Sequence, residues 1–321
     1  MPFSTTALQV LLLMLYAVPG FLLVKTRLLT ADHITPISKI LIYICQPCLE
    51  ISAFCSAERT PSLLADMGWF FLLCTGLQVV VIIFLSLLMR KTRKSDDPSG
   101  AKAVCARVST FAGTFGNVGF FGIPLLQALL PAEYAADAVA LSAVFAVSMN
   151  WLAWTVGLWM ITGEPRHIRI RALLLNPATI ALVIALPLFF SGIRLPSALD
   201  DAVGLCGKMA TPLCMIALGM RLAATKWKRI FTDAFAWISC AGKLLLLPLL
   251  AFGVCFFLPL APYLKATLFL LCCCPTASAV QNFSEVFLTG REGKESAANA
   301  ILLSNLLCIL TIPLLACLIQ L

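Results

Sequence analysis

Ten long apolar segments follow one another along the chain, separated by short polar connections. A helix of roughly 20 apolar residues crosses the hydrocarbon core of a bilayer, which is about 30 Å thick. Such a helix pairs its own backbone N–H and C=O groups, as the absence of water in that core requires. The sequence therefore predicts an all-α polytopic membrane protein with spans over residues 8–24, 37–57, 67–89, 104–130, 135–161, 172–193, 199–222, 231–258, 263–288 and 297–321.

The composition excludes a soluble globular protein. Apolar residues make up 61% of the 321 residues and charged residues only 12%, whereas soluble domains have about 45–50% and about 25%. No connection between spans is long enough for a soluble domain. The sequence also lacks a phosphate-binding glycine loop, an HExxH-type metal site and a paired nucleophile and base. We therefore predict neither an enzyme nor a cofactor.

Basic residues are distributed unevenly between the loops. Eighteen lie in or beside the loops after odd-numbered spans, and only Arg59, Arg194 and Lys265 lie on the other side. Basic loops stay in the cytoplasm, so we predict a multi-pass protein of the cell membrane, the bacterial inner membrane, with both termini outside. The net charge of +8 follows this topology, and no nucleic-acid partner is predicted.

The two halves of the chain resemble each other weakly. Pro47 in the second span corresponds to Pro212 in the seventh, and a tryptophan begins the third span of each half. Because each half has five spans, the second half enters the membrane from the opposite side. We predict two inverted five-helix repeats, residues 1–162 and 163–321, which is a common plan of secondary transporters.

The fourth and ninth spans carry residues that interrupt helices. The fourth contains glycines at three-residue spacing and then Pro124, and the ninth contains Pro275 at the corresponding place. Each glycine costs a helix about 1 kcal/mol and an interior proline about 3 kcal/mol. A glycine face for close packing and a simple proline kink are the alternatives. Two interruptions at matching positions favour broken crossover helices instead.

Broken helices at membrane depth are tolerated only around a cavity or a ligand. Their half-helix N-termini present free N–H groups and a positive dipole end, which favour an anion. The candidate substrate-binding residues at the two interruptions are Asn117, Gly119, Gly122, Pro124, Pro275, Thr276, Ser278 and Gln281.

Charged residues inside spans are functional candidates by default. Lys208 precedes Pro212 of the seventh span by one turn. Attraction of a carboxylate substrate and pairing with an acidic residue are the two interpretations of this lysine. Gln46 adjoins Pro47 of the second span. Lys208 and Gln46 join the candidate substrate-binding residues. For Lys243 we favour pairing or snorkelling. Glu50 and Glu285 are candidate proton or cation sites, although solvated interfacial carboxylates are the favoured interpretation. No metal site is predicted.

The fourth span also carries a family motif. Asn117 followed by Gly122-Ile123-Pro124-Leu125-Leu126 resembles the crossover motif of the auxin efflux carrier family, and the resemblance extends over essentially the whole chain. It implies a scaffold of spans 1, 2, 6 and 7, a transport domain of spans 3–5 and 8–10, and elevator-type alternating access. The central loop, residues 162–171, is short as in bacterial members, which are associated with malate, malonate and other small carboxylates. The resemblance thus implies a secondary active transporter of a small organic anion.

Two other functions remain open at this point. One is a sodium-coupled carrier of the bile-acid-type fold, although residues 275–284 contain no acid. The other is an anion channel or receptor, because broken helices also build pores. We expect coupling to protons or to the membrane potential, with a small carboxylate and the lipid bilayer as partners. A homodimer is left open.

Overall fold

The computed structural model describes residues 3–56, 60–93, 100–163, 175, 177–225 and 227–319. Seven continuous helices in this part of the chain are long and apolar enough to cross a membrane: Phe3–Lys25, Ala31–Ser56, Ser62–Leu88, Ala132–Thr162, Ser197–Ala224, Ala234–Phe257 and Arg291–Ala316. Shorter apolar helices overlap the remaining three predicted spans: Val118–Leu129, Thr179–Ser191 and Pro262–Cys273. The all-α polytopic fold is confirmed. Most of the predicted central loop, from residue 164 onward, lies outside the described residues.

The helices of the first half are α1 (Phe3–Leu15), α2 (Ala17–Lys25), η1 (Ala31–His33), α3 (Ile34–Ile40), η2 (Leu41–Cys45), α4 (Gln46–Ser56), α5 (Pro61–Leu88), α6 (Arg90–Arg93), α7 (Ala101–Ala112), η3 (Val118–Gly122), α8 (Ile123–Leu129), α9 (Ala132–Leu152), η4 (Ala153–Gly157) and α10 (Leu158–Thr162). Those of the second half are α12 (Pro177–Ser191), α13 (Ser197–Lys208), α14 (Ala210–Ala224), α15 (Trp227–Thr232), α16 (Ala234–Ala241), η6 (Gly242–Leu246), α17 (Leu247–Phe257), α18 (Pro262–Cys273), α19 (Ala279–Phe287) and α20 (Arg291–Ala316). Segments η2, η3, η4 and η6 are π-helical and continue the adjoining α-helices.

The outer surface of these helices is apolar. On α5, for example, Leu72, Ile83 and Leu87 are each more than half exposed. Soluble monomers rarely expose continuous apolar surface of this kind. The long apolar segments therefore form helices that pack on one another along one face and turn the other face toward lipid.

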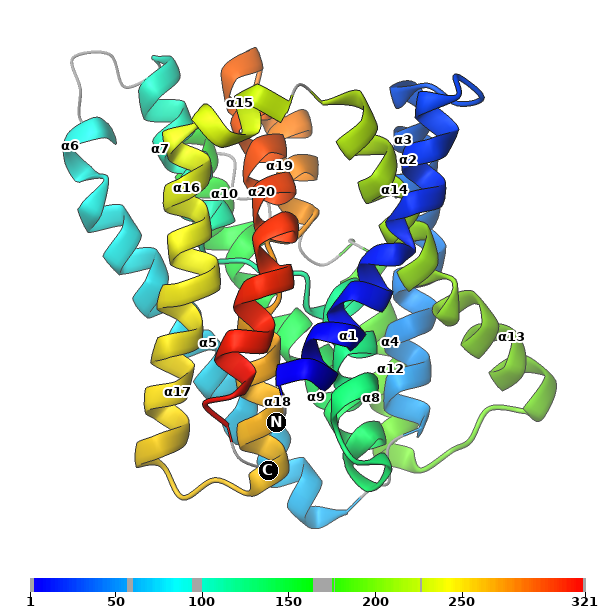
Figure 1. Ribbon diagram of the computed structural model, residues 1–321. Coiled ribbons are helices and arrows are strands. Elements are labelled where there is room, and N and C mark those ends of the chain that lie inside the picture. Colours follow the sequence, from blue (N-terminus) through cyan, green and yellow to red (C-terminus); the bar gives the residue numbers. More distant parts are fainter. Residues whose placement is uncertain are drawn as a thin grey trace.

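The helices pack in two groups (Figure 1). One group, at the right of the figure, contains α2, α3, α4, α12, α13 and α14, which contact one another. In the other, α5 packs on α9, α7 and α16 pack on α20, and α17 packs on α18. The groups correspond to spans 1, 2, 6 and 7 and to spans 3–5 and 8–10. They meet where α1 contacts α20 and α4 contacts α9.

The tightest helix crossing joins α2 to α14. A Cβ atom added at Gly20 would lie 2.0 Å from the Ile216 carbonyl oxygen, and one added at Gly219 would lie 1.8 Å from the Ala17 carbonyl oxygen. Only glycine permits two backbones to approach this closely. The two glycines thus fix the first span against the seventh.

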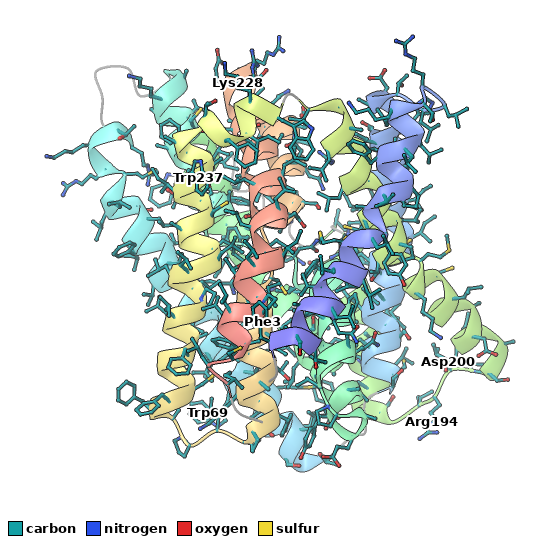
Figure 2. All side chains as sticks on the ribbon, viewed as in Figure 1. Phe3, Trp69, Arg194, Asp200, Lys228 and Trp237 are labelled. Carbon is teal, nitrogen blue, oxygen red and sulfur yellow. The ribbon has the colours of Figure 1, made fainter. Side chains whose placement is uncertain are left out.

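Two short basic helices mark one end of the molecule. Both chain ends lie at the bottom of Figure 1, whereas the basic helices α6 and α15 lie at the top. Figure 2 shows Lys228 at the top and Arg194 at the bottom. Trp69 and Trp237, which begin the third span of each half, also lie toward opposite ends. Equivalent residues at opposite ends are what an inverted repeat requires.

Candidate functional site

The breaks in the fourth and ninth spans pair with each other. Helix α7 ends at Ala112 and η3 begins at Val118, while α18 ends at Cys273 and α19 begins at Ala279. Between these ends Gly116 and Thr276 form an antiparallel bridge. The N–H of Asn117 donates to the Pro275 carbonyl at 2.8 Å, and the N–H of Ala277 donates to the Phe115 carbonyl at 2.9 Å. These two bonds satisfy backbone groups that a continuous helix would otherwise pair.

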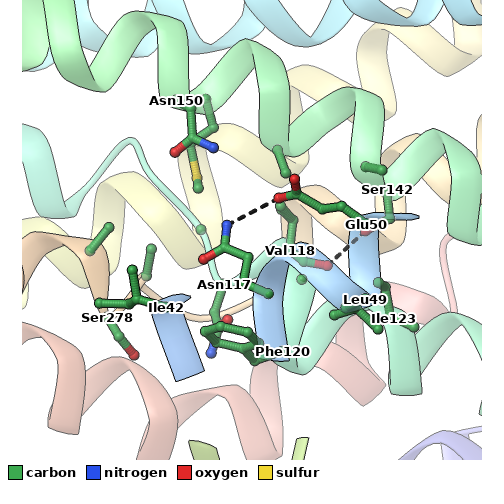
Figure 3. Close-up of a pocket in the computed structure, with 18 of the residues that line it drawn as sticks. Ile42, Leu49, Glu50, Asn117, Val118, Phe120, Ile123, Ser142, Asn150 and Ser278 are labelled. Atoms are coloured by element: carbon green, nitrogen blue, oxygen red, sulfur yellow. Dashed lines mark hydrogen bonds between the residues drawn. The ribbon is translucent and has the colours of Figure 1, made fainter. Parts of the chain in front are cut away.

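Side chains hold the crossover from several directions. The buried Thr276 hydroxyl donates to the Ala112 carbonyl at 3.1 Å, and the Thr276 N–H donates to the Ser304 hydroxyl at 3.1 Å. At the break in the fourth span, the Ser142 hydroxyl of α9 donates to the Val118 carbonyl at 2.8 Å (Figure 3). The unwound segments are therefore a fixed structure and do not depend on a ligand for every hydrogen bond.

A pocket opens beside the crossover. It lies between α4, the two breaks and α9, and Figure 3 shows Glu50, Asn117, Asn150 and Ser278 around it. Its polar side chains belong to Gln46, Glu50, Asn117, Ser142, Asn150, Ser278 and Asn282. The pocket also meets the first residues of η3 and of α19. In the described chain, no backbone partner accepts from the N–H groups of Gly119, Phe120, Ser278 or Ala279.

A second pocket adjoins the first. The residues that line both pockets are Ile42, Asn117, Phe120, Ser278 and Asn282, so the two pockets share a wall at the crossover. Cys214, Arg221 and Asn305 line only the second. The Asn117 amide nitrogen lies 3.8 Å from the Cys214 sulfur, and Asn117 is only 7% exposed. Asn117 thus stands at the junction of the two pockets.

Arg221 is a pocket residue that the sequence reasoning missed. Arg221 is one of the eighteen basic residues assigned above to the loops after odd-numbered spans, because it lies near the end of the predicted seventh span. Helix α14 continues to Ala224, so Arg221 occupies its last turn and lines the second pocket. None of the ion pairs found among the described residues involves its guanidinium. The signal was present in the sequence, because an arginine one residue before Leu222 stands within the apolar segment.

The predicted site residues divide into two sets. Gln46, Asn117, Gly119 and Ser278 line the first pocket. The other six predicted residues line neither pocket: Gly122, Pro124, Pro275, Thr276, Gln281 and Lys208.

Local contacts explain why this second set lies outside the pockets. A Cβ at Gly122 would lie 2.8 Å from a Leu271 methyl group, so this glycine serves packing. Pro124 lies in the first turn of α8. Gln281 donates to Glu285 at 2.7 Å. Lys208 is exposed at the end of α13.

The structure corrects two interpretations of buried charge. Glu50 is not a solvated interfacial carboxylate, because it is 7% exposed, lines the first pocket and accepts from Gln46 at 3.1 Å. Lys243 does not snorkel, because it is fully buried, and among the described residues it pairs with no acid but donates to the Cys272 carbonyl at 2.7 Å. The Glu285 side chain is half exposed, and its carboxylate lies 3.3 Å from the Lys294 ammonium.

A comparison with protein families agrees with this architecture. A family model described as "Membrane transport protein" matches residues 2–172 and residues 164–316. The two matched segments cover nearly the whole chain and meet close to the expected boundary between the halves. A comparison with curated proteins finds no match. The broken helices, the crossover motif and the family match lead to one conclusion: the chain belongs to the auxin efflux carrier-type family of membrane transport proteins.

Proposed function

We propose that the protein is a secondary active transporter that moves a small carboxylate across the cell membrane by alternating access at the crossover. The observation that carries this proposal is the meeting of two half-helix N-termini at one polar pocket. The N–H groups of Gly119, Phe120, Ser278 and Ala279 have no backbone partner in the described chain. Helix N-termini with free N–H groups attract anions. The pocket is therefore suited to an anionic group.

The side chains around the crossover favour a carboxylate in particular. Gln46, Asn117 and Asn150 bring amide groups to the first pocket, and Arg221 brings a guanidinium to the second. A carboxylate accepts hydrogen bonds through both oxygens and matches the forked geometry of arginine. A small dicarboxylate has one such group for each pocket. This fit supports organic acids of a few carbon atoms as the substrate class.

The location of the first pocket supports elevator-type movement. Its walls come from α4 in one helix group and from the breaks and α9 in the other. A substrate held by the crossover would travel with that second group when it slides against the first. The proposal places the basic loops in the cytoplasm and both termini outside.

The variant Asn117→Ala tests the site. We expect it to bind the substrate roughly ten- to hundredfold more weakly while remaining folded, because a hydrogen bond to a charged group contributes about 1.5–3 kcal/mol. A thermal-shift screen of carboxylates on purified protein identifies the ligand. Calorimetry then gives its affinity, and uptake with counterflow in proteoliposomes separates a carrier from a channel.

Thr114→Ala is the matched control for this experiment. Thr114 lies in the same break, but its hydroxyl donates to the Thr110 carbonyl at 2.9 Å and does not line a pocket. We expect its affinity to change little. Equal affinities of Asn117→Ala and the wild type for an identified substrate would remove Asn117 from the site.

Glu50 is the proposed proton site of the transporter. Its buried carboxylate lines the same pocket as the expected anion. Two negative charges in one buried pocket repel each other unless a proton neutralises one of them. We expect Glu50→Gln to lose the stimulation of uptake by a pH gradient while it retains substrate exchange. Glu133→Gln, at an exposed position in the first turn of α9, is the control. Gradient-driven uptake by Glu50→Gln at the wild-type rate would move the proton site elsewhere.

A further inference from the structure

The Lys243 side chain lies beside the crossover and lines neither pocket. It lies on η6 in the eighth span and is completely buried. Its ammonium group donates to the Cys272 carbonyl at 2.7 Å. Cys272 belongs to the last turn of α18, where the ninth span breaks. The lysine therefore reaches the C-terminal end of a half-helix.

The same side chain also lies against the break in the fourth span. A Cβ atom added at Gly116 would lie 2.5 Å from Cε and 2.8 Å from Nζ of Lys243. Gly116 itself pairs with Thr276 in the crossover bridge. The ammonium group thus occupies a fixed place beside both broken helices, and glycine at position 116 leaves room for it.

No carboxylate balances this charge within the described chain, where the ion pairs found involve other residues. The groups that face this charge are the carbonyls at the end of α18, where the helix dipole is negative and Cys272 accepts from the ammonium. Placing an ammonium ion in a membrane interior is costly. A lysine at this position therefore requires a role that an apolar side chain does not fill.

Secondary transporters with broken helices use this kind of place for a coupling ion, because unwound carbonyls and half-helix C-terminal ends coordinate sodium. We propose that Lys243 is a built-in cation that takes the place of a bound sodium ion at the crossover. The positive charge is covalently attached, so it stabilises the crossover permanently and cannot be carried across the membrane. Transport is consequently independent of sodium, a statement that rests on the proposed function.

The charge itself can be tested without a substrate, by the melting temperature of the purified protein. We expect the wild type to melt at the same temperature in sodium chloride and in choline chloride at equal ionic strength. Lys243→Ala should melt lower, by about 5 °C or more, and methylammonium should restore part of the loss by entering the vacated space. Lys243→Met should also melt lower, but methylammonium should not restore it, because the methionine chain fills that space without a charge.

Lys208→Ala is the matched control, since Lys208 is exposed at the end of α13 and its removal should leave the melting temperature unchanged. Wild-type stability in Lys243→Met would overturn the proposal, because an apolar spacer would then suffice. A higher melting temperature of the wild type in sodium than in choline would also overturn it, even if neither variant can be purified. If these results hold but no carboxylate is transported, only the proposed function fails.

Discussion

Replacing Gly219 with alanine is expected to lower the melting temperature of the purified protein by about 5–10 °C. The added methyl group would lie 1.8 Å from the Ala17 carbonyl oxygen and 2.8 Å from the Phe21 nitrogen. Both atoms belong to the backbone of α2, so no side-chain rotation relieves the overlap and the two helices must separate. Overpacking of this kind costs about 1–3 kcal/mol or more, and each kcal/mol shifts the melting temperature by several degrees.

Gly76→Ala is the control for this substitution. Gly76 lies in the middle of α5, and a Cβ atom there would have nothing within 4 Å. Alanine favours a helix over glycine by about 1 kcal/mol, so this variant should melt at or above the wild-type temperature. If Gly219→Ala were as stable as Gly76→Ala, the first and seventh spans could not cross as closely as described.

The second large effect is expected at Arg221. Arg221→Gln should weaken binding of the identified carboxylate by roughly ten- to hundredfold, because it removes a charged hydrogen-bond donor worth about 1.5–3 kcal/mol. The affinity of Arg221→Lys should fall between those of the wild type and Arg221→Gln, since lysine keeps the charge but loses the forked geometry. Calorimetry on each purified variant measures the change, and the melting temperature shows that the protein remains folded.

Arg229→Gln provides the comparison for Arg221. Arg229 lies on α15, and its half-exposed side chain pairs with Glu295 at 2.9 Å. Exposed ion pairs contribute about 0–1 kcal/mol, so substrate affinity should not change. Wild-type affinity in Arg221→Gln, together with a loss in Asn117→Ala, would assign the anion to the crossover alone and exclude the second pocket from substrate binding.

The features that the sequence predicted well are those that neighbouring residues determine. The spans follow from continuous apolar composition, and the breaks follow from glycines and prolines in the fourth and ninth spans. Asn117, Gly119 and Ser278 lie at the pocket because they are within a few residues of those breaks. In these cases position along the chain was sufficient.

The features that were missed depend on packing between distant spans. Glu50 is buried because α4 packs on α9, and nothing in its own span indicates that contact. The partner of Lys243 lies 29 residues away, at the end of another helix. Thr276 was predicted to bind substrate, yet its hydroxyl bonds to Ala112, 164 residues away. Polar residue type alone does not distinguish a ligand from such a structural bond.

The crossover also sets conditions for biogenesis. The Asn117 N–H and the Phe115 carbonyl find their partners in Pro275 and Ala277, about 160 residues later in the chain. A nascent polypeptide that has emerged from the ribosome only through its fifth span lacks those partners. Its fourth span then places unpaired backbone groups in lipid, at a cost of several kcal/mol for each group. Insertion of the early spans therefore precedes their final folding, which must wait until the ninth span has been translated and inserted.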